Sequence, residues 1–555
     1  MPMREDERIL NQAGQMEVKA SLTKLVEGRI EFGGFEAKVM PIMERNRIGM
    51  INISRIFHTY GKRRRQPSPA MIKALESQAV KGIPGFTTRA IATTMWGCAK
   101  IKWLPGGEML MRLEERACEL EKEFDAQGIA NTLWAYGTLG VHPGHDLMER
   151  LERRAVDKAG EFKPQEISNT FWAYGKLGMQ PGKELVDGLE ARAVVRAGDF
   201  VPQDVANTLW AYGTLEMHPG EELVSGLEAQ AVSRGRDFNS HDISNLLWAF
   251  GTLEIQPGDQ VMRAMEKQAA VKAKEFNPQG IANTLWAYAK LRIKPGQDVL
   301  TRLDARAVLR AEEFKPQEIS NILWAFGTMG VPPGPQLMRR LENQAIARSN
   351  EFNPQGISNT LWAFATLGVK PGPQLIKRFE AQGVSRAADF TPQNFANTLW
   401  AYGSLGMQPG QVLVRRLETR AVARSKDFNP QNIANTLWAY GKLGVQPGQE
   451  LTRRLEAQAV SRAGEFNPQN IANTLWAYAN LKMQAGQELL KKLEAQAGSR
   501  VEDFKANEAE DALWAFTTLK WEPEDGLVRR LEARKVGSED SDSGEELEMT
   551  THSPD

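Results

Sequence analysis

The sequence has 555 residues and equal numbers of cationic and acidic side chains, 69 lysine and arginine against 69 aspartate and glutamate, so its formal net charge is zero. Its two cysteines exclude a disulfide framework, and its six histidines share no metal-ligand spacing with cysteines or carboxylates. No apolar run reaches the length of a membrane span, and a chain this long has to be searched for internal repeats before its domains are counted.

The first 48 residues, 1–48, are a poorly defined lead-in. They begin with an acid-rich stretch that has neither the apolar core of a signal peptide nor the acid-poor bias of a transit peptide, so we expect no targeting peptide. Residues 49–85 resemble the later units in outline, because Ile53 and Phe57 stand where the first regular unit has Ile91 and Met95. We therefore predict a degenerate repeat over 49–85 that caps the N-terminal end of the array.

A 38-residue period dominates residues 86–534. Tryptophan marks it at Trp96, Trp134, Trp172, Trp210, Trp248, Trp286, Trp324, Trp362, Trp400, Trp438, Trp476 and Trp514. Phenylalanine recurs with the same period from Phe86 to Phe504. A unit of this size cannot bury its apolar face alone, so neighbouring units must stack. The predicted fold class is all-α: a right-handed α-α superhelix, or solenoid, of about twelve 38-residue helix-turn-helix repeats.

Each unit contains two expected helices, here called helix A and helix B. In the unit 428–465, Asn429 before Pro430 is an N-cap followed by a proline at the first helical position, so helix A begins there. The glycine-rich stretch 444–448 ends it. Helix B is expected over about residues 449–463, with Leu451 and Leu455 on its apolar stripe.

On a helical wheel, helix A is predicted to be amphipathic. Trp438 and Leu437 fall on one arc, and Asn432, Asn435 and Ala439 fall on the opposite one. Small residues one turn from each tryptophan leave room for the indole and for a neighbouring backbone. We therefore expect the tryptophans to pack one repeat against the next, and the opposite arc to be polar surface.

The last unit and the tail differ from the rest. Helices over 508–519 and 525–534 are expected to form a C-terminal cap, and residues 535–555 an acidic disordered tail. From Gly537 onward the chain has seven acids and no lysine or arginine, so the rest has 69 cations against 62 acids, a formal charge of +7. A mildly basic body is compatible with a polyanionic partner.

Two kinds of position on helix A are candidate RNA contacts, because one kind is constant between repeats and the other varies. The variable positions are Glu166, Asp204, Asp242, Glu318, Asn394, Asn432, Asn470, Lys176, Lys290 and Lys442. The constant asparagines are Asn131, Asn169, Asn207, Asn245, Asn283, Asn321, Asn359, Asn397, Asn435 and Asn473. The alternative for the asparagines is a ladder that hydrogen-bonds each repeat to the next, and the alternative for the variable positions is solvated surface.

Helix B has a recurrent cation near its end. The series runs through Lys158, Arg196, Arg234, Lys272, Arg310, Arg348, Arg386, Arg424, Arg462 and Arg500. Evenly spaced cations suit phosphate contacts, although each could instead pair with the acid three residues later, as Arg462 can with Glu465. In the second half of the chain, adjacent cations such as Arg339 and Arg340 thicken the positive charge.

Catalytic chemistry is not indicated. The sequence has no glycine-rich phosphate loop after a strand and no nucleophile elbow, and nearly every polar residue recurs a dozen times, whereas a catalytic site is a singular arrangement. We expect a protein that is not an enzyme and has no metal, no cofactor, no membrane contact and no small-molecule substrate.

The unit from Pro430 to Gly448, with its Pro-Gln, Ala-Asn-Thr-Leu-Trp-Ala-Tyr and Pro-Gly elements, resembles the octotricopeptide repeat. Proteins with this 38-residue helical repeat are organellar RNA-binding proteins, related to RNA-processing proteins that have a RAP domain, and no RAP-like domain follows the last repeat here. The resemblance implies sequence-selective binding of single-stranded RNA in RNA processing, stability or translation, in a chloroplast or mitochondrion, with other RNA-processing proteins as partners. The alternative is a protein-binding scaffold for an extended peptide or a partner's helix.

Overall fold

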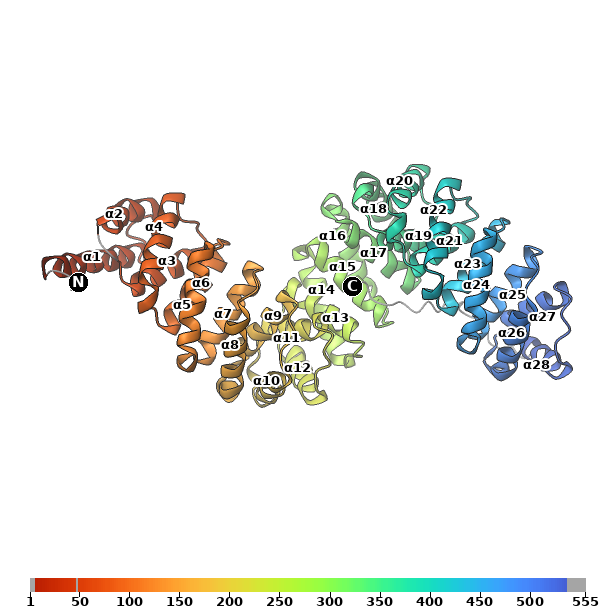
Figure 1. Ribbon diagram of the computed structural model, residues 1–555, viewed down its shortest axis with the longest axis horizontal. Coiled ribbons are helices and arrows are strands. Elements are labelled where there is room, and N and C mark those ends of the chain that lie inside the picture. The colour runs from red at the N-terminus through yellow and green to blue at the C-terminus, as the bar shows by residue number, and fades with distance from the viewer. Residues whose placement is uncertain (1–4, 46–47, 537–555) are drawn as a thin grey trace. The chain divides into compact units, whose positions relative to one another are not determined.

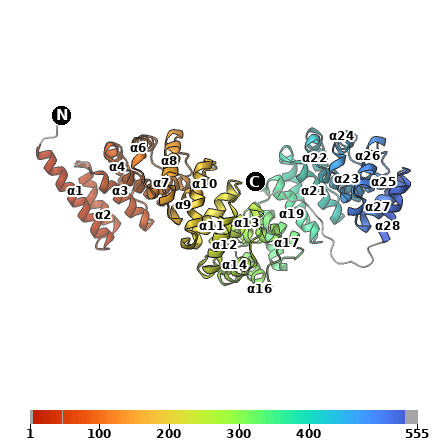
Figure 2. The same cartoon turned by 90° about the horizontal axis from the view of Figure 1, so that it is seen from below.

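The computed structural model describes residues 5–45 and 48–536, and every regular element in these ranges is a helix. The chain falls into two compact units, Met1–Lys272 and Ala273–Asp555. Within each unit the helices follow one another in colour order (Figures 1 and 2). The first unit contains α1 (Glu5–Val26), α2 (Phe32–Arg45), α3 (Met50–Arg63), α4 (Pro69–Gly82), α5 (Thr88–Lys100), α6 (Gly107–Glu119), α7 (Ala126–Leu139), α8 (His145–Lys158), α9 (Pro164–Leu177), α10 (Lys183–Val195), α11 (Pro202–Thr214), α12 (Glu221–Ser233), α13 (Ser240–Leu253) and α14 (Asp259–Lys272).

The second unit repeats the pattern. It contains α15 (Pro278–Lys290), α16 (Gln297–Leu309), α17 (Pro316–Met329), α18 (Pro335–Ala347), α19 (Pro354–Thr366), α20 (Pro373–Ser385), α21 (Pro392–Leu405), α22 (Gln411–Ala423), α23 (Pro430–Leu443), α24 (Gln449–Ser461), α25 (Pro468–Asn480), α26 (Gln487–Ser499), α27 (Ala506–Thr518) and α28 (Asp525–Val536). From α5 onward the odd-numbered helices are the expected helices A and the even-numbered ones the expected helices B. A short 3-10 helix, such as η8 (Ser349–Glu351), follows most helices B.

In each unit the helices form two layers. Odd-numbered helices pack against odd-numbered neighbours, as α21 does against α19 and α23, and even-numbered helices pack against even-numbered ones. The expected all-α repeat fold is therefore confirmed, whereas the handedness of the superhelix stays a prediction.

Local chemistry accounts for the ends of helix A. The Asn429 side chain accepts a hydrogen bond from the Asn432 N–H (2.8 Å), and Pro430 occupies the first helical position, where no N–H is needed. At the other end Gly444 takes a left-handed conformation with φ of 65°, which only glycine adopts at no steric cost, and the chain turns toward helix B.

A glutamate on helix B connects three segments of neighbouring repeats. Glu418 on α22 accepts hydrogen bonds from the Tyr440 hydroxyl on α23 (2.6 Å) and from the Gly448 N–H that precedes α24 (3.0 Å). Glu152 makes the same two contacts, with Tyr174 and Gly182. This carboxylate supplies the N-terminal cap that the glycine before helix B cannot supply itself.

Aromatic and small residues fill the space between layers. The phenylalanines from Phe86 to Phe504 are buried, and burying one such side chain stabilises the fold by about 1.5–3 kcal/mol. A glycine allows successive helices A to approach closely, because a Cβ at Gly441 would lie 2.6 Å from the Trp476 ring. The tryptophan of the next repeat also lies against Gly61, Gly137, Gly175, Gly213 and Gly327, so the expected packing of one repeat against the next is confirmed at these places, whereas Trp514 of the last repeat is exposed.

Two features of the fold differ from expectation. Residues 5–45, in the range taken as a poorly defined lead-in, form α1 and α2, which pack against α3 and α4, so the degenerate repeat 49–85 is not the first helical pair. The predicted polar arc of helix A is wrong in part: Ala439, Asn435 and Asn432 are buried. Each helix A packs against the helix A of the preceding repeat and that of the following repeat, so side chains on more than one arc of the helix are buried. The tail from residue 537 lies outside the described residues.

Candidate nucleic-acid interface

One stripe of side chains on helix A is partly accessible, although its tryptophan is buried in α15, α17, α19 and α21. In α9 it consists of Gln165, Asn169, Trp172 and Lys176, where the glutamine and lysine are exposed and the other two are half-buried. These positions are four, three and four residues apart, so they lie along one face of the helix. We call this set, with its equivalents in other repeats, the helix-A stripe.

The constant asparagines are the middle of this stripe. They are half-buried or buried, and the Asn245 Nδ2 lies 3.4 Å from the His241 Nδ1 on the preceding turn of α13. Among the residues that the structure describes, none of the ten asparagine side chains hydrogen-bonds a neighbouring repeat. Both alternatives for these asparagines, the inter-repeat ladder and contact with RNA, stay predictions.

The tryptophans form a row along the same stripe. The rings of Trp134 and Trp172 stack with centroids 6.1 Å apart. The ammonium of Lys176 lies 5.7 Å from the Trp172 ring centroid and 4.8 Å from that of Trp210, and Lys442 lies in the same way over two indoles. These lysines of the variable series thus hold positive charge on the aromatic row. Lys290 is half-buried at the end of α15.

The other variable positions are at the third residue of helix A and serve as caps. Glu166 accepts a hydrogen bond from the Lys163 N–H (2.9 Å), and Glu318 accepts one from the Lys315 N–H (2.8 Å). The same bond is made by Asp204, Asp242, Asn394 and Asn432, and Asn470 is buried at the same place in α25. The bond from the N-cap N–H is one half of a capping box, and the reciprocal bond, from the N–H of the third residue to the N-cap side chain, is formed at Asn239, Thr391 and Asn429.

Two of these caps also connect neighbouring repeats. Asp204 accepts a hydrogen bond from the Ser168 hydroxyl (2.9 Å), 36 residues earlier, and the Asn394 amide donates one to the Ser358 hydroxyl (3.3 Å). Burial raises the pKa of the Asp204 carboxyl, against the lowering effect of its hydrogen bonds from Ser168 and from the Val201 N–H. The cap positions are therefore occupied by structural contacts, and base reading by them stays a prediction that this geometry does not favour.

The recurrent cations of helix B end the helix or follow its last residue. Arg348 pairs with Glu351 and also donates to the Phe314 carbonyl (3.2 Å), and Arg386 lies 2.6 Å from Asp389. The pair with the acid three residues later is formed by Lys158, Arg196, Arg310, Arg348, Arg386, Arg424, Arg462 and Arg500. Arg234 follows α12, and Lys272 ends α14. An exposed pair contributes only about 0–1 kcal/mol, so such a guanidinium can exchange its carboxylate for a phosphate.

One hollow brings the predicted series together. It has a volume of about 270 Å³ and lies between the N-terminal halves of α17 and α19. Its lining includes Asn321 and Asn359 of the constant series, Arg348 of the cation series, and the glutamines Gln317 and Gln355. We call it the α17–α19 groove. It presents amide donors and acceptors beside the Arg348 guanidinium, which is paired with Glu351, another lining residue, so a phosphate there would have to displace that carboxylate.

Sequence reasoning missed two sets of residues. The glutamines at the start of the helix-A stripe were not singled out, although a recurring Pro-Gln pair was a usable signal. The second set is an arginine or glutamine on helix B that donates to the phenylalanine carbonyl 30 residues earlier, as Arg192 does to Phe162 (3.0 Å) and Gln382 to Phe352 (2.8 Å). Its signal was the restriction of one position to these two residue types.

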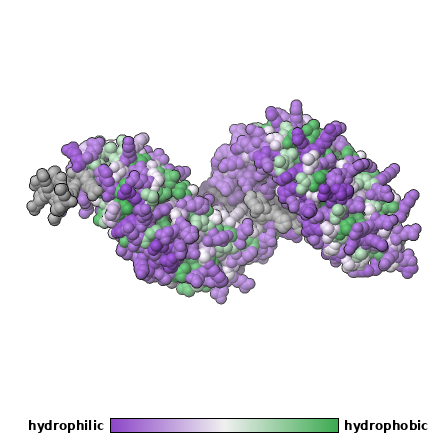
Figure 3. Space-filling model, in the orientation of Figure 1, coloured by the Kyte–Doolittle hydropathy of each residue, from purple (hydrophilic) through white to green (hydrophobic). Residues whose placement is uncertain are grey.

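Other kinds of site are not apparent in residues 5–45 and 48–536. No three histidine, cysteine, aspartate or glutamate side chains in these ranges gather as metal ligands, and no helix there is long and apolar enough to cross a membrane. On the side seen in Figure 3, each unit shows mostly hydrophilic residues with scattered hydrophobic ones.

A family model for the RNA-editing substrate-binding complex 6 protein matches residues 38–294, 257–373 and 337–540. These matches together span most of the chain. The chain belongs to this family. Membership associates it with RNA processing and with a helical repeat fold. No curated protein sequence matches the chain significantly.

Solved structures give only distant likenesses to this family member. A homology model of the full-length AP-3 complex has 11% sequence identity and a TM-score of 0.30, with 93% of this chain and 92% of that chain covered. Yeast importin-β, Kap95p, has 10% identity and a TM-score of 0.32, with 92% and 68% covered. Kap95p bound to RanGDP has 12% identity and a TM-score of 0.32, with 85% and 67% covered.

Proposed function

We propose that this protein binds single-stranded RNA along the helix-A stripes, as a non-catalytic component of an RNA-processing assembly. The observation that carries the proposal is the α17–α19 groove, where Asn321, Asn359 and Arg348 line one hollow. An asparagine amide can both donate to and accept from a base edge, and a guanidinium suits a phosphate. Membership in an RNA-editing substrate-binding family supports RNA as the ligand.

The proposal extends from one groove to the array. Because the stripe recurs in each repeat, each repeat would meet about one nucleotide, as in other helical repeat proteins that read RNA, and the regular units would cover about a dozen. The lysines above the tryptophan row, Lys176 and Lys442, would add charge near the phosphates. The similarity to octotricopeptide repeats fits this mode, and the family match supports an organellar, mitochondrial location and gives no support to a chloroplast.

An RNA selection experiment tests the proposal. Sequences enriched by the wild-type protein should contain a preferred stretch, and Asn321→Ala with Asn359→Ala should relax the preference at one or two adjacent positions. The loss for the original base should be about 1–3 kcal/mol, the scale of a base contact. Folding should be retained, because alanine is the better helix former and the two amides cap no helix.

The matched control uses a cap position in place of a groove position. Asn432→Glu, alone or with Lys442→Thr, keeps an acceptor for the Asn429 N–H, as Glu318 does for Lys315, and should leave the enriched sequence unchanged at the position of Asn432. If the cap variant shifts the preference and the groove variant does not, the base-reading residues are the caps. If no variant and no wild-type protein enriches any sequence, the protein-scaffold alternative takes the place of RNA recognition.

A further inference from the structure

The outer side of the second unit has a concentration of cations that the helix-A stripes do not use. α18, α20 and α22 each present two adjacent exposed cations. We call these six residues the outer cation row: Arg339, Arg340, Lys377, Arg378, Arg415 and Arg416. The three helices pack side by side, α18 against α20 and α20 against α22, so the axes of neighbouring helices are about 8–10 Å apart.

The row is poorly neutralised by its surroundings. None of the three helices has an acid in its first turn, where α24 has Glu450. In α24 that acid binds both cations of the equivalent pair, Arg453 and Arg454, at 2.7 Å each. In the row itself the Arg340 Nη1 lies 3.8 Å from Glu312, and the other five cations have no ion pair among the residues that the structure describes.

Adjacent exposed cations occur at this position on helices B of the second unit, and they are not a general property of helix B. The equivalent pairs on α10 and α12, in the first unit, are Asp187 with Gly188 and Ser225 with Gly226. A cation pair is therefore no requirement of the repeat fold, because two helices B fold with an acid or small residues at the same places. A set of exposed like charges also repels itself, so the folded state gains nothing from it without a counter-charge.

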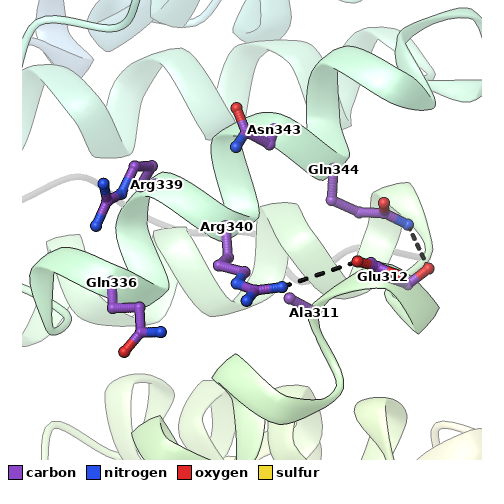
Figure 4. A pocket seen from close by; sticks show the side chains of 7 residues that line it. All are labelled: Ala311, Glu312, Gln336, Arg339, Arg340, Asn343 and Gln344. Atoms are coloured by element: carbon purple, nitrogen blue, oxygen red, sulfur yellow. Dashed lines mark hydrogen bonds and ion pairs between the residues drawn. The ribbon is translucent and has the colours of Figure 1, made fainter.

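At α18 the row borders a hollow of about 300 Å³ (Figure 4). The side chains of Arg339, Arg340, Gln336 and Asn343 line it, and its acid, Glu312, is held by Arg340 at one side. Gln344 donates to the Glu312 carbonyl oxygen (2.8 Å), so this part of the lining is fixed. On the Arg339 side of the hollow, guanidinium and amide groups are available as hydrogen-bond donors, and no carboxylate among the described residues that line it faces them. Such donors suit an anionic oxygen.

The row lies near the groove along α18. Arg348, which follows α18, lines the α17–α19 groove, and Arg340 of the row lies eight residues earlier, about 12 Å along the helix axis and about 80° around it. A polyanion in the groove therefore has a neighbouring positive surface on which to continue. Three helices of paired cations on an open face suit an extended chain of phosphates better than a small ligand.

We propose that RNA bound along the helix-A stripes of the second unit, with the α17–α19 groove among them, continues over the outer cation row, where its phosphates are bound without base reading. This inference rests on the proposed function and adds a second surface for the same ligand. The row sets affinity and salt dependence, whereas the groove sets sequence preference.

Salt titration of RNA binding tests the row. The row variant changes all six cations to glutamine, and a charge-matched control changes six exposed cations of the first unit to glutamine: Lys73, Arg112, Arg153, Lys183, Arg263 and Lys267. The probes are two single-stranded RNAs with the selected sequence, one of about 12 nucleotides, as expected for the helix-A stripes of the regular units, and one of about 30. Circular dichroism establishes that both variants fold.

With the longer RNA, the plot of log Kd against log salt should lose up to about 4 in steepness in the row variant, at about 0.7 per phosphate contact. The control should keep the wild-type slope, the shorter RNA should respond less, and the enriched sequence should be the same in all three proteins. A row variant whose slope equals that of the control overturns the proposal. A further pair of variants then neutralises the seven acids of residues 537–555 in the wild-type protein and in the row variant. If this change alters RNA binding by the wild-type protein and not by the row variant, the row binds the acidic residues 537–555 and not RNA.

The outcome for the groove is separate. If Asn321→Ala with Asn359→Ala alters sequence preference while the row variant behaves like the control, the proposed function stands and this inference fails. If the row variant loses salt dependence while the groove variant is indistinguishable from wild type, the row binds RNA and base recognition by the groove fails.

Discussion

At the scale of single residues, a position on helix A that varies between repeats acts as a cap, and its chemistry is set by burial. Asp204 and Asn394 hold the same place, accept a hydrogen bond from the N-cap N–H, and contact a serine of the preceding repeat. An acid and an amide can thus make nearly the same bonds. They differ in the cost of burying a charge.

Asp204→Asn should therefore stabilise the protein at neutral pH. Burial raises the pKa of the Asp204 carboxyl above its unfolded value, so the folded state is penalised once the pH rises through the folded pKa. Below the unfolded value, about 3.9, the carboxyl is protonated in both states and the penalty is absent. The gain in unfolding free energy should be present at pH 7 and shrink toward pH 4, as measured by urea unfolding at each pH.

The reverse exchange is the control for this prediction. Asn432→Asp places a carboxylate in an equally buried cap on α23 and should cost stability at pH 7 with the opposite pH dependence. If Asp204→Asn lowers stability at pH 7, the attraction of the helix N-terminus and the bond from Ser168 outweigh desolvation.

At the scale of elements, the period, the caps and the buried phenylalanine and leucine positions were predictable, because they follow from local chemistry and from a fixed spacing. The surface of helix A was not. Asn432 and Asn435 look alike in sequence and both are buried, but only Asn432 is a cap, whereas Asn435 stands at the asparagine position of the helix-A stripe. A helical wheel assumes one buried face, whereas α23 is packed by both α21 and α25.

The candidate site was predictable in its parts and not in its assembly. The constant asparagines and the recurrent cations were recognised as series, since each repeats every 38 residues. Their meeting in one groove could not be predicted, because Arg348 follows helix B whereas Asn321 and Asn359 lie on two different helices A. The distance between such residues depends on how repeats stack, which no single repeat contains.

The end of helix A gives a second prediction at this scale. In several repeats a residue just past the end of helix A has a left-handed backbone. It is glycine, as at Gly444 (φ 65°), or a residue with a side chain, such as Lys482 (φ 51°), the second residue after α25. The left-handed conformation costs a residue with a Cβ roughly 1–2 kcal/mol, and glycine avoids that cost but gains freedom in the unfolded chain. Lys482→Gly should raise the unfolding free energy by about 0.5–1 kcal/mol, measured by chemical denaturation.

The matched exchange is Gly444→Lys, which introduces the strain that Lys482→Gly removes. It should lower the unfolding free energy by about 1 kcal/mol, measured in the same way. If both variants had the unfolding free energy of the wild-type protein, the residue type at the left-handed position would have no influence on stability.

At the scale of the whole molecule, stability is expected to be a sum of contacts between neighbouring repeats. Within the second unit, α21 packs against α19 and α23, and α22 packs against α20 and α24. The interface is the same in kind from repeat to repeat: Trp438 stacks on Trp400 at 6.1 Å, and Trp476 lies against Trp438 at 6.4 Å. A repeat in the middle of the unit is therefore replaceable by its neighbour.

Deletion of residues 392–429, which removes α21, α22 and the loop to α23, should leave a folded protein. α19 would then meet α23, which offers Trp438 and Ala439 where α21 offered Trp400 and Ala401, so the apolar surfaces remain complementary. Circular dichroism should show helicity in proportion to the shorter chain, and urea should unfold it cooperatively. Deletion of residues 392–410 removes α21 alone and leaves α22 with no helix A to cover Leu413 and Leu417, so this variant should lose cooperativity or aggregate.

The same 392–429 deletion should shorten the selected RNA sequence by about one nucleotide, since one stripe is lost. A folded deletion variant that selects the full wild-type sequence would contradict reading by repeats, and an unfolded one would show that stability is not shared out between neighbours.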